Sequence, residues 1–325
     1  MKRLVYIVLL ITVCMTARGQ QLPLYSQYLY NKFLINPAVA GSDGYTSVNL
    51  TAREQWVGYK GAPRTFSFSF QTRMLKRGYM LKRTNTGRQI YRPKTDGRVG
   101  LGGYVFSDRN GLVQRTGVQA SYAYHLWLKS TTQLSMGLAF TAYHYKIDET
   151  QLNFEDPNEP WLNNDLRLGI FVPDAIFGVY LINPKYSVGF SADQLFEASA
   201  KIGDDAYRNF RLYRHYYLFG SYNFILNTRM DLEPSFIFKM SEQLKPQADI
   251  GLTYNYDQSF WAGLAYRTSG AIIANVRIRY MNIFIGYAFD FTLHEIQRIT
   301  YGTHELSLAM KFGDNTRRYR WLDRY

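Results

Sequence analysis

The sequence predicts an all-β protein, a transmembrane antiparallel β-barrel of about fourteen strands of the outer-membrane type. Three observations favour this class: an N-terminal segment typical of a secretory signal peptide, repeated stretches in which apolar and polar residues alternate, and no later apolar run long enough for a membrane-spanning helix. Alternation with a period of two is the pattern of strands with two chemically different faces. Only one of those faces is apolar where a barrel strand crosses lipid.

The first 19 residues have the three parts of a signal peptide. Lys2 and Arg3 supply the charge, residues 4–15 form the apolar core, and small residues precede a cut after Gly19. The core is too short to span a bilayer as an ordinary helix. It contains Cys14, the only cysteine of the chain, so the exported protein is predicted to have no disulfide. These features predict export, and together with the alternating strands they predict the outer membrane.

The aromatic and glycine content fits a strand-rich membrane barrel, and the net positive charge indicates which kinds of partner the protein binds. Aromatic residues make up 17% of the 325 residues, with 28 tyrosines, and glycine occurs 25 times. The formal charge is +13, and it falls to +10 when Lys2, Arg3 and Arg18 of the signal peptide are removed. In an exported protein this surplus points to anionic lipid, cell-wall polymer or an acidic protein rather than to nucleic acid.

Fourteen stretches alternate well enough to be strands, an even number, as in bacterial barrels. In one of them Phe66, Phe68 and Phe70 share a face, and serine and threonine residues occupy the other. Apolar faces of about five residues match the distance across the hydrocarbon at a tilt. The predicted strands span residues 46–56, 64–73, 97–107, 112–127, 132–147, 174–183, 186–194, 214–226, 229–240, 246–256, 259–267, 271–280, 283–291 and 303–312.

The lengths of the links predict the orientation of the barrel. With the N-terminus in the periplasm, the longer links at 148–173, 195–213 and 292–302 lie outside the cell. The acidic residues of the first outer link form either a solvated loop, a cation-bridged lipopolysaccharide contact or a calcium site. They are Glu155, Asp156, Glu159 and Asp165. The short turns at 129–131, 184–185, 227–228, 257–258 and 281–282 are then periplasmic.

One predicted periplasmic link, residues 74–96, is long and strongly basic. It is either a solvated loop or a docking surface for a periplasmic partner or cell-wall polymer. Its basic residues are Lys76, Arg77, Lys82, Arg83, Arg88, Arg92 and Lys94.

No constellation of residues predicts catalysis, so we expect a non-enzymatic protein with no cofactor and no metal site. The stretch Gly189-Phe-Ser-Ala-Asp193 lacks the last glycine of a nucleophile elbow. The five histidines are scattered, without the spacing of metal ligands. His125 is predicted to be a hydrogen-bonded residue on the lumen face.

Charged residues of both signs are predicted to face the lumen. Such groups either pair and close a narrow barrel or line a water channel in a wide one. They are Arg53, Asp231, Glu233, Lys239, Asp249, Arg267, Arg277, Arg279, Asp290, Glu305 and Lys311. The predicted organisation is a signal peptide (1–19), a periplasmic or lumenal N-terminal segment (20–45) that is a candidate plug, the β-barrel (46–312) and a basic C-terminal tail (313–325).

Several short blocks of sequence, taken together in their order along the chain, are similar to those of a known family. They are Gln21-Leu-Pro-Leu-Tyr-Ser-Gln-Tyr28, Asn36-Pro-Ala-Val-Ala-Gly41, Arg53-Glu-Gln-Trp-Val-Gly58, Gly61-Ala-Pro63 and Gly302-Thr-His-Glu-Leu306. In this order the blocks resemble the PorP/SprF family of the Bacteroidetes type IX secretion system. The resemblance implies an outer-membrane barrel in secretion and gliding motility. It also implies binding, delivery or anchoring of a secreted cell-surface adhesin through its C-terminal domain, or contact with the translocon and its periplasmic ring proteins. A passive porin or substrate channel is the alternative.

The same blocks contain the candidate residues for plugging the barrel or binding a partner. The alternation of side chains along the first strand places Arg53 and Gln55 in the lumen and Trp56 on the outside, in the interfacial aromatic belt. A tight turn between the first two strands is predicted at Gly58, Gly61 and Pro63. The hypothesis is that residues 21–41 pack inside the barrel against Arg53 and Gln55; the alternative is a segment needed only to start the barrel during folding. The candidates from this segment are Tyr25, Gln27, Tyr28, Asn36 and Pro37.

Overall fold

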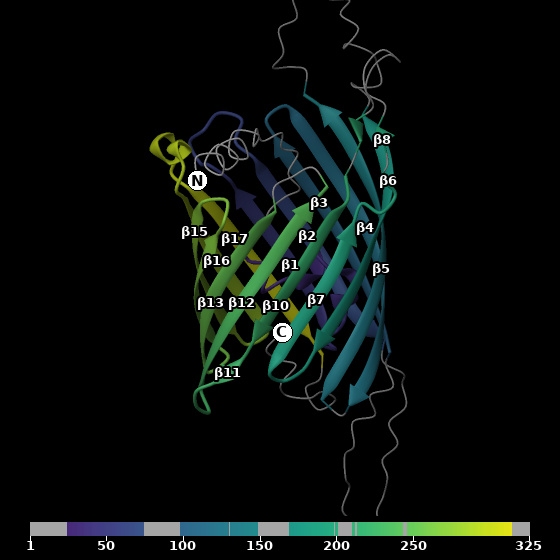
Figure 1. Cartoon of the computed structure of the whole chain (residues 1–325), viewed down its shortest axis with the longest axis vertical. Helices are drawn as coiled ribbons and strands as arrows, with labels where there is room; N and C mark the ends of the chain where they lie inside the picture. Colours follow the sequence, from purple (N-terminus) through teal and green to yellow (C-terminus); the bar gives the residue numbers. More distant parts are fainter. Residues whose placement is uncertain are drawn as a thin grey trace, which may run out of the picture.

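A computed structural model describes residues 25–74, 98–129, 131–148, 169–197, 199–200, 210–211, 213–242 and 246–313 (Figure 1). The predicted signal peptide, the basic residues between 76 and 94, the acidic residues between 155 and 165 and the tail after residue 313 lie outside the described residues. Within the described ranges, none of the helices is long and apolar enough to cross a membrane.

Fourteen long antiparallel strands make up the described sheet, with three two-residue strands beside them. The long strands are β1 (Thr46–Glu54), β2 (Arg64–Met74), β3 (Val99–Asn110), β4 (Val113–Lys129), β5 (Thr132–Ile147), β6 (Ile170–Ile182), β7 (Tyr186–Asp193), β10 (His215–Tyr222), β12 (Met230–Ser241), β13 (Gln247–Tyr256), β14 (Phe260–Arg267), β15 (Ala271–Tyr280), β16 (Ile283–Thr292) and β17 (Thr303–Phe312). The short strands are β8 (Ser199–Ala200), β9 (Phe210–Arg211) and β11 (Phe224–Ile225).

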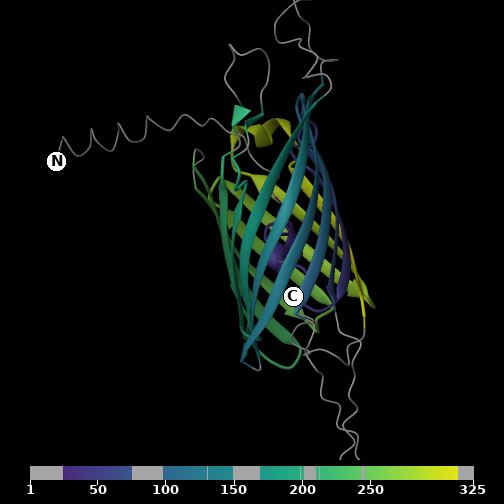
Figure 2. The same cartoon turned by 90° about the vertical axis from the view of Figure 1, so that its right-hand side faces the viewer.

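The sheet closes on itself into a barrel. Each long strand pairs with the long strands before and after it, the first strand β1 pairs with the last strand β17, and β10 pairs with β12. Closure leaves none of the long strands with an unpaired edge. Figures 1 and 2 show the tilted strands around an enclosed interior. The predicted fourteen-stranded antiparallel barrel is confirmed.

Alternation along each strand separates an outer apolar surface from a polar interior. On β2 the side chains of Phe66, Phe68 and Phe70 are exposed on the outside, whereas Ser67 and Ser69 are buried in the lumen. The same two-residue period continues along β15 and β16. The apolar face matches lipid and the polar face matches an enclosed lumen.

The predicted strand limits need three corrections. The first strand ends at Glu54, because Trp56 adopts a φ of +48° and its backbone N–H donates to Thr303 Oγ1 at 3.2 Å. Trp56 therefore lies in a turn and not on the outer face of a strand. The predicted strand at 214–226 is divided into β10 and β11, and the one predicted at 174–183 begins earlier, at Ile170. The link at 292–302 contains a 3-10 helix, η5 (Glu295–Ile299).

Residues 25–45, here called the lumenal segment, lie inside the barrel (Figure 2, purple). The segment contains two short 3-10 helices, η1 (Lys32–Leu34) and η2 (Pro37–Val39). The loop rim is the end of the barrel with the links after β1, β5, β7 and β16; the turn rim is the end with the turns after β4, β6, β13 and β15. Ser26 contacts β16 and β17 near the loop rim, and Gly41 donates its N–H to Gln71 of β2 near the turn rim. The lumenal segment therefore runs along much of the length of the barrel.

Candidate functional site

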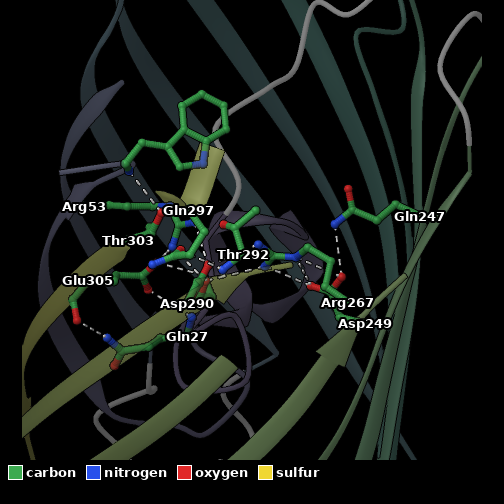
Figure 3. A network of polar contacts seen from close by, with 12 residues as sticks. Gln27, Arg53, Gln247, Asp249, Arg267, Asp290, Thr292, Gln297, Thr303 and Glu305 are labelled. Carbon is green, nitrogen blue, oxygen red and sulfur yellow. Dashed lines mark hydrogen bonds and ion pairs between the residues drawn. The ribbon is translucent and has the colours of Figure 1, made fainter. Parts of the chain in front are cut away.

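A cluster of six charged side chains runs along the lumen wall from the junction of the first and last strands to β12, and Figure 3 labels five of them. At its centre is Arg53, which is 2% exposed and pairs with Asp290 and Glu305 at 2.9 Å each. The pairing of β1 with β17 places Arg53 directly opposite Glu305. The other members of this charge cluster are Arg267, Asp249 and Lys239. They continue it through the pairs Arg267–Asp290 (3.2 Å), Arg267–Asp249 (3.1 Å) and Lys239–Asp249 (3.2 Å).

The charge cluster balances three cations against three anions. A buried charge is tolerated only when it is paired and hydrogen-bonded. The four most deeply buried members, Arg53, Asp249, Asp290 and Glu305, are each paired, although Asp290 Oδ1 makes no hydrogen bond within the described structure. The predicted lumen charges thus pair with one another rather than line open water at this place.

The charge cluster also binds the backbone of the lumenal segment. The two carboxylate oxygens of Glu305 accept the backbone N–H groups of Ser26 (2.7 Å) and Gln27 (2.9 Å). The Ser26 hydroxyl donates to Asp290 at 2.6 Å and accepts from Arg53 at 2.7 Å. The Gln27 amide donates to the Glu305 carbonyl at 3.0 Å (Figure 3) and accepts from the Ser307 hydroxyl at 2.6 Å. Charge-assisted hydrogen bonds of this length are among the stronger ones in proteins.

Side chains of the first half of the lumenal segment join it to several further strands. The Tyr25 hydroxyl lies 2.6 Å from that of Tyr104, and burial raises the pKa of Tyr25 to about 12, so the phenol stays protonated near neutral pH. The Tyr30 hydroxyl donates to Asn275 at 2.8 Å. The Lys32 ammonium donates to the Ser187 hydroxyl at 3.2 Å, and burial lowers the pKa of Lys32.

The Asn36 side chain joins the lumenal segment to β6 and β7. Asn36 caps η2 by accepting the Ala38 N–H at 2.9 Å, and its amide donates to the carbonyls of Val179 and Phe190 at 3.0 Å each. Pro37 begins η2, a position that proline favours because its N–H is not needed there. The motif at residues 36–37 therefore forms a capped turn that is bonded to β6 and β7.

Three wall glycines make room for this part of the lumenal segment. A Cβ on Gly100 would overlap the Ala40 carbonyl, one on Gly137 would overlap the backbone of Ala38, and one on Gly178 would overlap the Asn36 side chain. A glycine in a strand often marks the close approach of another backbone. Sequence reasoning missed these residues, and the signal that could have found them is glycine at lumen-facing positions of neighbouring strands.

Replacing Gly100 with alanine is expected to destabilise the protein by about 1–3 kcal/mol, because the added methyl group overpacks the wall against Ala40. The matched control is Gly103→Ala on the same strand, where the nearest atom to an added Cβ is the Gln119 carbonyl oxygen at 3.9 Å. Heat-modifiability on semi-native gels of the detergent-solubilised variants measures the difference. Equal melting of the two variants would contradict the close approach of the lumenal segment.

His125 and Gln133 hold the end of the lumenal segment near the turn rim. The His125 ring lies 3.0 Å from the Ala40 carbonyl through Nε2 and 2.7 Å from the Ser135 hydroxyl through Nδ1. The Gln133 amide donates to the Ser42 carbonyl at 3.2 Å. The prediction that His125 is a hydrogen-bonded lumen residue is confirmed. Among the described residues, no group of three or more histidine, cysteine or acidic side chains is arranged to hold a metal ion.

The structure does not bring all of the candidate residues together. Tyr25, Gln27, Tyr28, Asn36, Pro37 and Arg53 lie inside the barrel. Gln55 contacts Arg53 rather than the lumenal segment, with its side-chain oxygen 3.2 Å from Arg53 Nε in the orientation that satisfies both groups. The remaining described candidates, Trp56, Gly58, Gly61 and Pro63, belong to the link between β1 and β2 at the loop rim.

This link is fastened to its neighbours by backbone hydrogen bonds. Val57 exchanges backbone bonds with the link after β16, donating to Gly302 at 2.9 Å and accepting from Tyr301 at 2.8 Å. Gly111, in the turn after β3, donates to the Gly61 carbonyl at 3.1 Å. Three links of the loop rim are therefore joined into one ordered surface.

One family model matches the chain, and several solved structures are similar to it. No curated protein matches the chain. The structure is similar to the outer membrane protein Omp33 of Acinetobacter baumannii, with 8% identity over 83% of this chain and 100% of that one and a TM-score of 0.44. It is also similar to the toluene transporter TodX of P. putida, with 8% identity over 86% of this chain and 94% of that one and a TM-score of 0.45. A family model described as type IX secretion system membrane protein PorP/SprF matches residues 17–310.

Proposed function

The chain belongs to the PorP/SprF family of type IX secretion system membrane proteins, and we propose that it acts there as a closed, non-enzymatic adaptor. As a member of this family with a barrel fold, it is an outer-membrane protein. In the proposed role it binds, delivers or anchors a secreted cell-surface adhesin through the C-terminal domain of that adhesin. Contact with the translocon and its periplasmic ring proteins is the second part of the proposal.

The observation that carries the proposal is the occupied lumen. In a passive porin, charged side chains line a water-filled channel. Here the carboxylates of Asp249, Asp290 and Glu305 are buried, paired with Arg53 and Arg267, and Glu305 also binds the backbone of the lumenal segment. This arrangement supports a closed barrel over the alternative of a porin or substrate channel.

The ordered surface at the loop rim supports binding of a protein outside the cell. The side chains of Tyr59, Ile299 and Tyr301 are exposed there, and Tyr301 is 78% exposed. Aromatic residues on a surface that is already ordered bind a partner with little loss of conformational entropy. The basic residues between 76 and 94 stay a prediction with two alternatives, a solvated loop or a docking surface for a periplasmic partner or cell-wall polymer.

The proposal is tested by a pull-down from native membranes. The wild-type protein should recover a large secreted surface protein, and the variant Tyr59→Ala/Tyr301→Ala should recover about tenfold less, as loss of two interface aromatics predicts. Tyr280→Ala is the matched control, because Tyr280 is 69% exposed but lies at the turn rim. The adhesin role is wrong if wild-type protein recovers no such partner, and the loop-rim surface is wrong if both variants recover it equally well.

A further inference from the structure

We propose that residues 25–31, here called the strap, are a movable cover over a peptide-binding site on β1, β16 and β17, whereas residues 33–42, here called the anchor, stay in place. The ligand of the uncovered site is a polypeptide with a turn that presents two consecutive backbone N–H groups to the Glu305 carboxylate, as residues 26–30 do. The inference rests on the proposed function, because the secreted partner would supply that polypeptide.

The wall binds the strap through backbone groups that any polypeptide in the same turn conformation carries. Glu305 binds two successive backbone N–H groups, of Ser26 and Gln27, and not a particular side chain. Next to it, Gly286 has no side chain, and a Cβ there would overlap the Gln27 amide oxygen. The wall therefore offers a polar cradle for a backbone with room for one long side chain. Peptides bound by their main chain are commonly recognised in this way, with affinity from the backbone and specificity from one or two side-chain positions.

The strap and the anchor are held by different kinds of contact. When the strap leaves, the ion pairs of Arg53 with Asp290 and Glu305 remain in place, so the wall charges keep their partners. The anchor instead fills space that Gly100, Gly137 and Gly178 leave empty. Removing the anchor would open voids in the wall, which is costly in a packed interior. An incoming backbone can therefore take over the polar contacts of the strap, whereas nothing replaces the packing of the anchor.

Space for this movement exists beside the strap. A cavity of about 60 Å³ is lined by Tyr25 and Tyr28 of the strap and by Tyr104, Arg115 and Tyr143 of the wall. Arg115 is buried, its Nη2 lies 3.7 Å from Asp108, and neither its Nε nor its Nη2 makes a hydrogen bond in the described structure. A cavity of this size holds water or accepts a displaced side chain. The strap is thus bound to the charge cluster on one side and borders this cavity on the other.

The test measures the reactivity of single cysteines, which is practical because Cys14 of the predicted signal peptide is the only native one. Leu29→Cys places the thiol in the strap outside the charge cluster, and Ala38→Cys places it in the anchor. A membrane-impermeant maleimide is added to the full-length protein in native membranes. The probe ligand is a synthetic peptide with the sequence of residues 25–31, Tyr-Ser-Gln-Tyr-Leu-Tyr-Asn, with a scrambled peptide as control.

Excess peptide is expected to raise the labelling rate at position 29 about tenfold through local opening, while position 38 stays unreactive. Glu305→Gln in the Leu29→Cys background should remove the effect of the peptide, because the amide cannot accept both backbone N–H groups as a carboxylate does. Unchanged labelling at position 29, equal acceleration at position 38, or equal acceleration by the scrambled peptide would each overturn the proposal. Because no adhesin is used, a failed pull-down alongside peptide-dependent labelling would refute the adhesin role and leave the strap intact.

Discussion

Replacing Arg53 with alanine is expected to lower the free energy of unfolding by about 3–5 kcal/mol, the usual cost of removing one partner from a buried ion pair. Arg53 binds Asp290, Glu305 and the Ser26 hydroxyl, and all three sites are buried. Arg267 still pairs with Asp290 in the variant, so Glu305 carries most of the uncompensated charge. Urea unfolding of the detergent-folded protein, followed by tryptophan fluorescence, measures the loss.

Arg64→Ala is the matched control for this loss. Arg64 also pairs with a carboxylate near the loop rim, Glu54, at 3.0 Å, but the two side chains are 62% and 42% exposed. Exposed pairs contribute about 0–1 kcal/mol because water screens both charges. A loss for Arg53→Ala no larger than that for Arg64→Ala would show that the charge cluster does not hold the barrel and the lumenal segment together.

The fold was predictable from the sequence because it depends on a local pattern. A strand that faces lipid on one side and an enclosed lumen on the other has to alternate, and residues 64–73 show this within a single stretch. The even number of strands and the long links could be read along the chain in the same way. The ends of strands depend on backbone conformation, which is why Trp56, with its positive φ, was wrongly placed on the outside of a strand.

The candidate site was predictable only in part. Parity predicts that Arg53 points inward, but its partners come from the other end of the chain. Its pairing with Glu305 follows from the register between β1 and β17, which exists only once the barrel has closed. The wall glycines were missed for another reason: Gly137 and Gly178 contribute no side chain to an alternating pattern, and their role appears only when Ala38 and Asn36 are placed against them.

The second large effect is expected from deleting residues 21–41. The deletion removes the strap and nearly all of the anchor, so the charge cluster and the wall glycines lose their contacts with the lumenal segment. A barrel of fourteen strands encloses more space than its own side chains fill, so water should enter. The variant should also unfold at a lower temperature than the wild-type protein, because contacts from both ends of the lumenal segment are lost. Gly103→Ala, with its intact lumenal segment, is the control for handling and refolding.

Conductance in a planar lipid bilayer tests most directly whether the lumenal segment closes the barrel. The wild-type protein and the Gly103→Ala variant should show no steady conductance, whereas the protein lacking residues 21–41 should show steady channels, with a current on the order of tenfold or more above background. Steady channels in the wild-type protein, or a deletion variant that stays closed and melts at the wild-type temperature, would contradict the account.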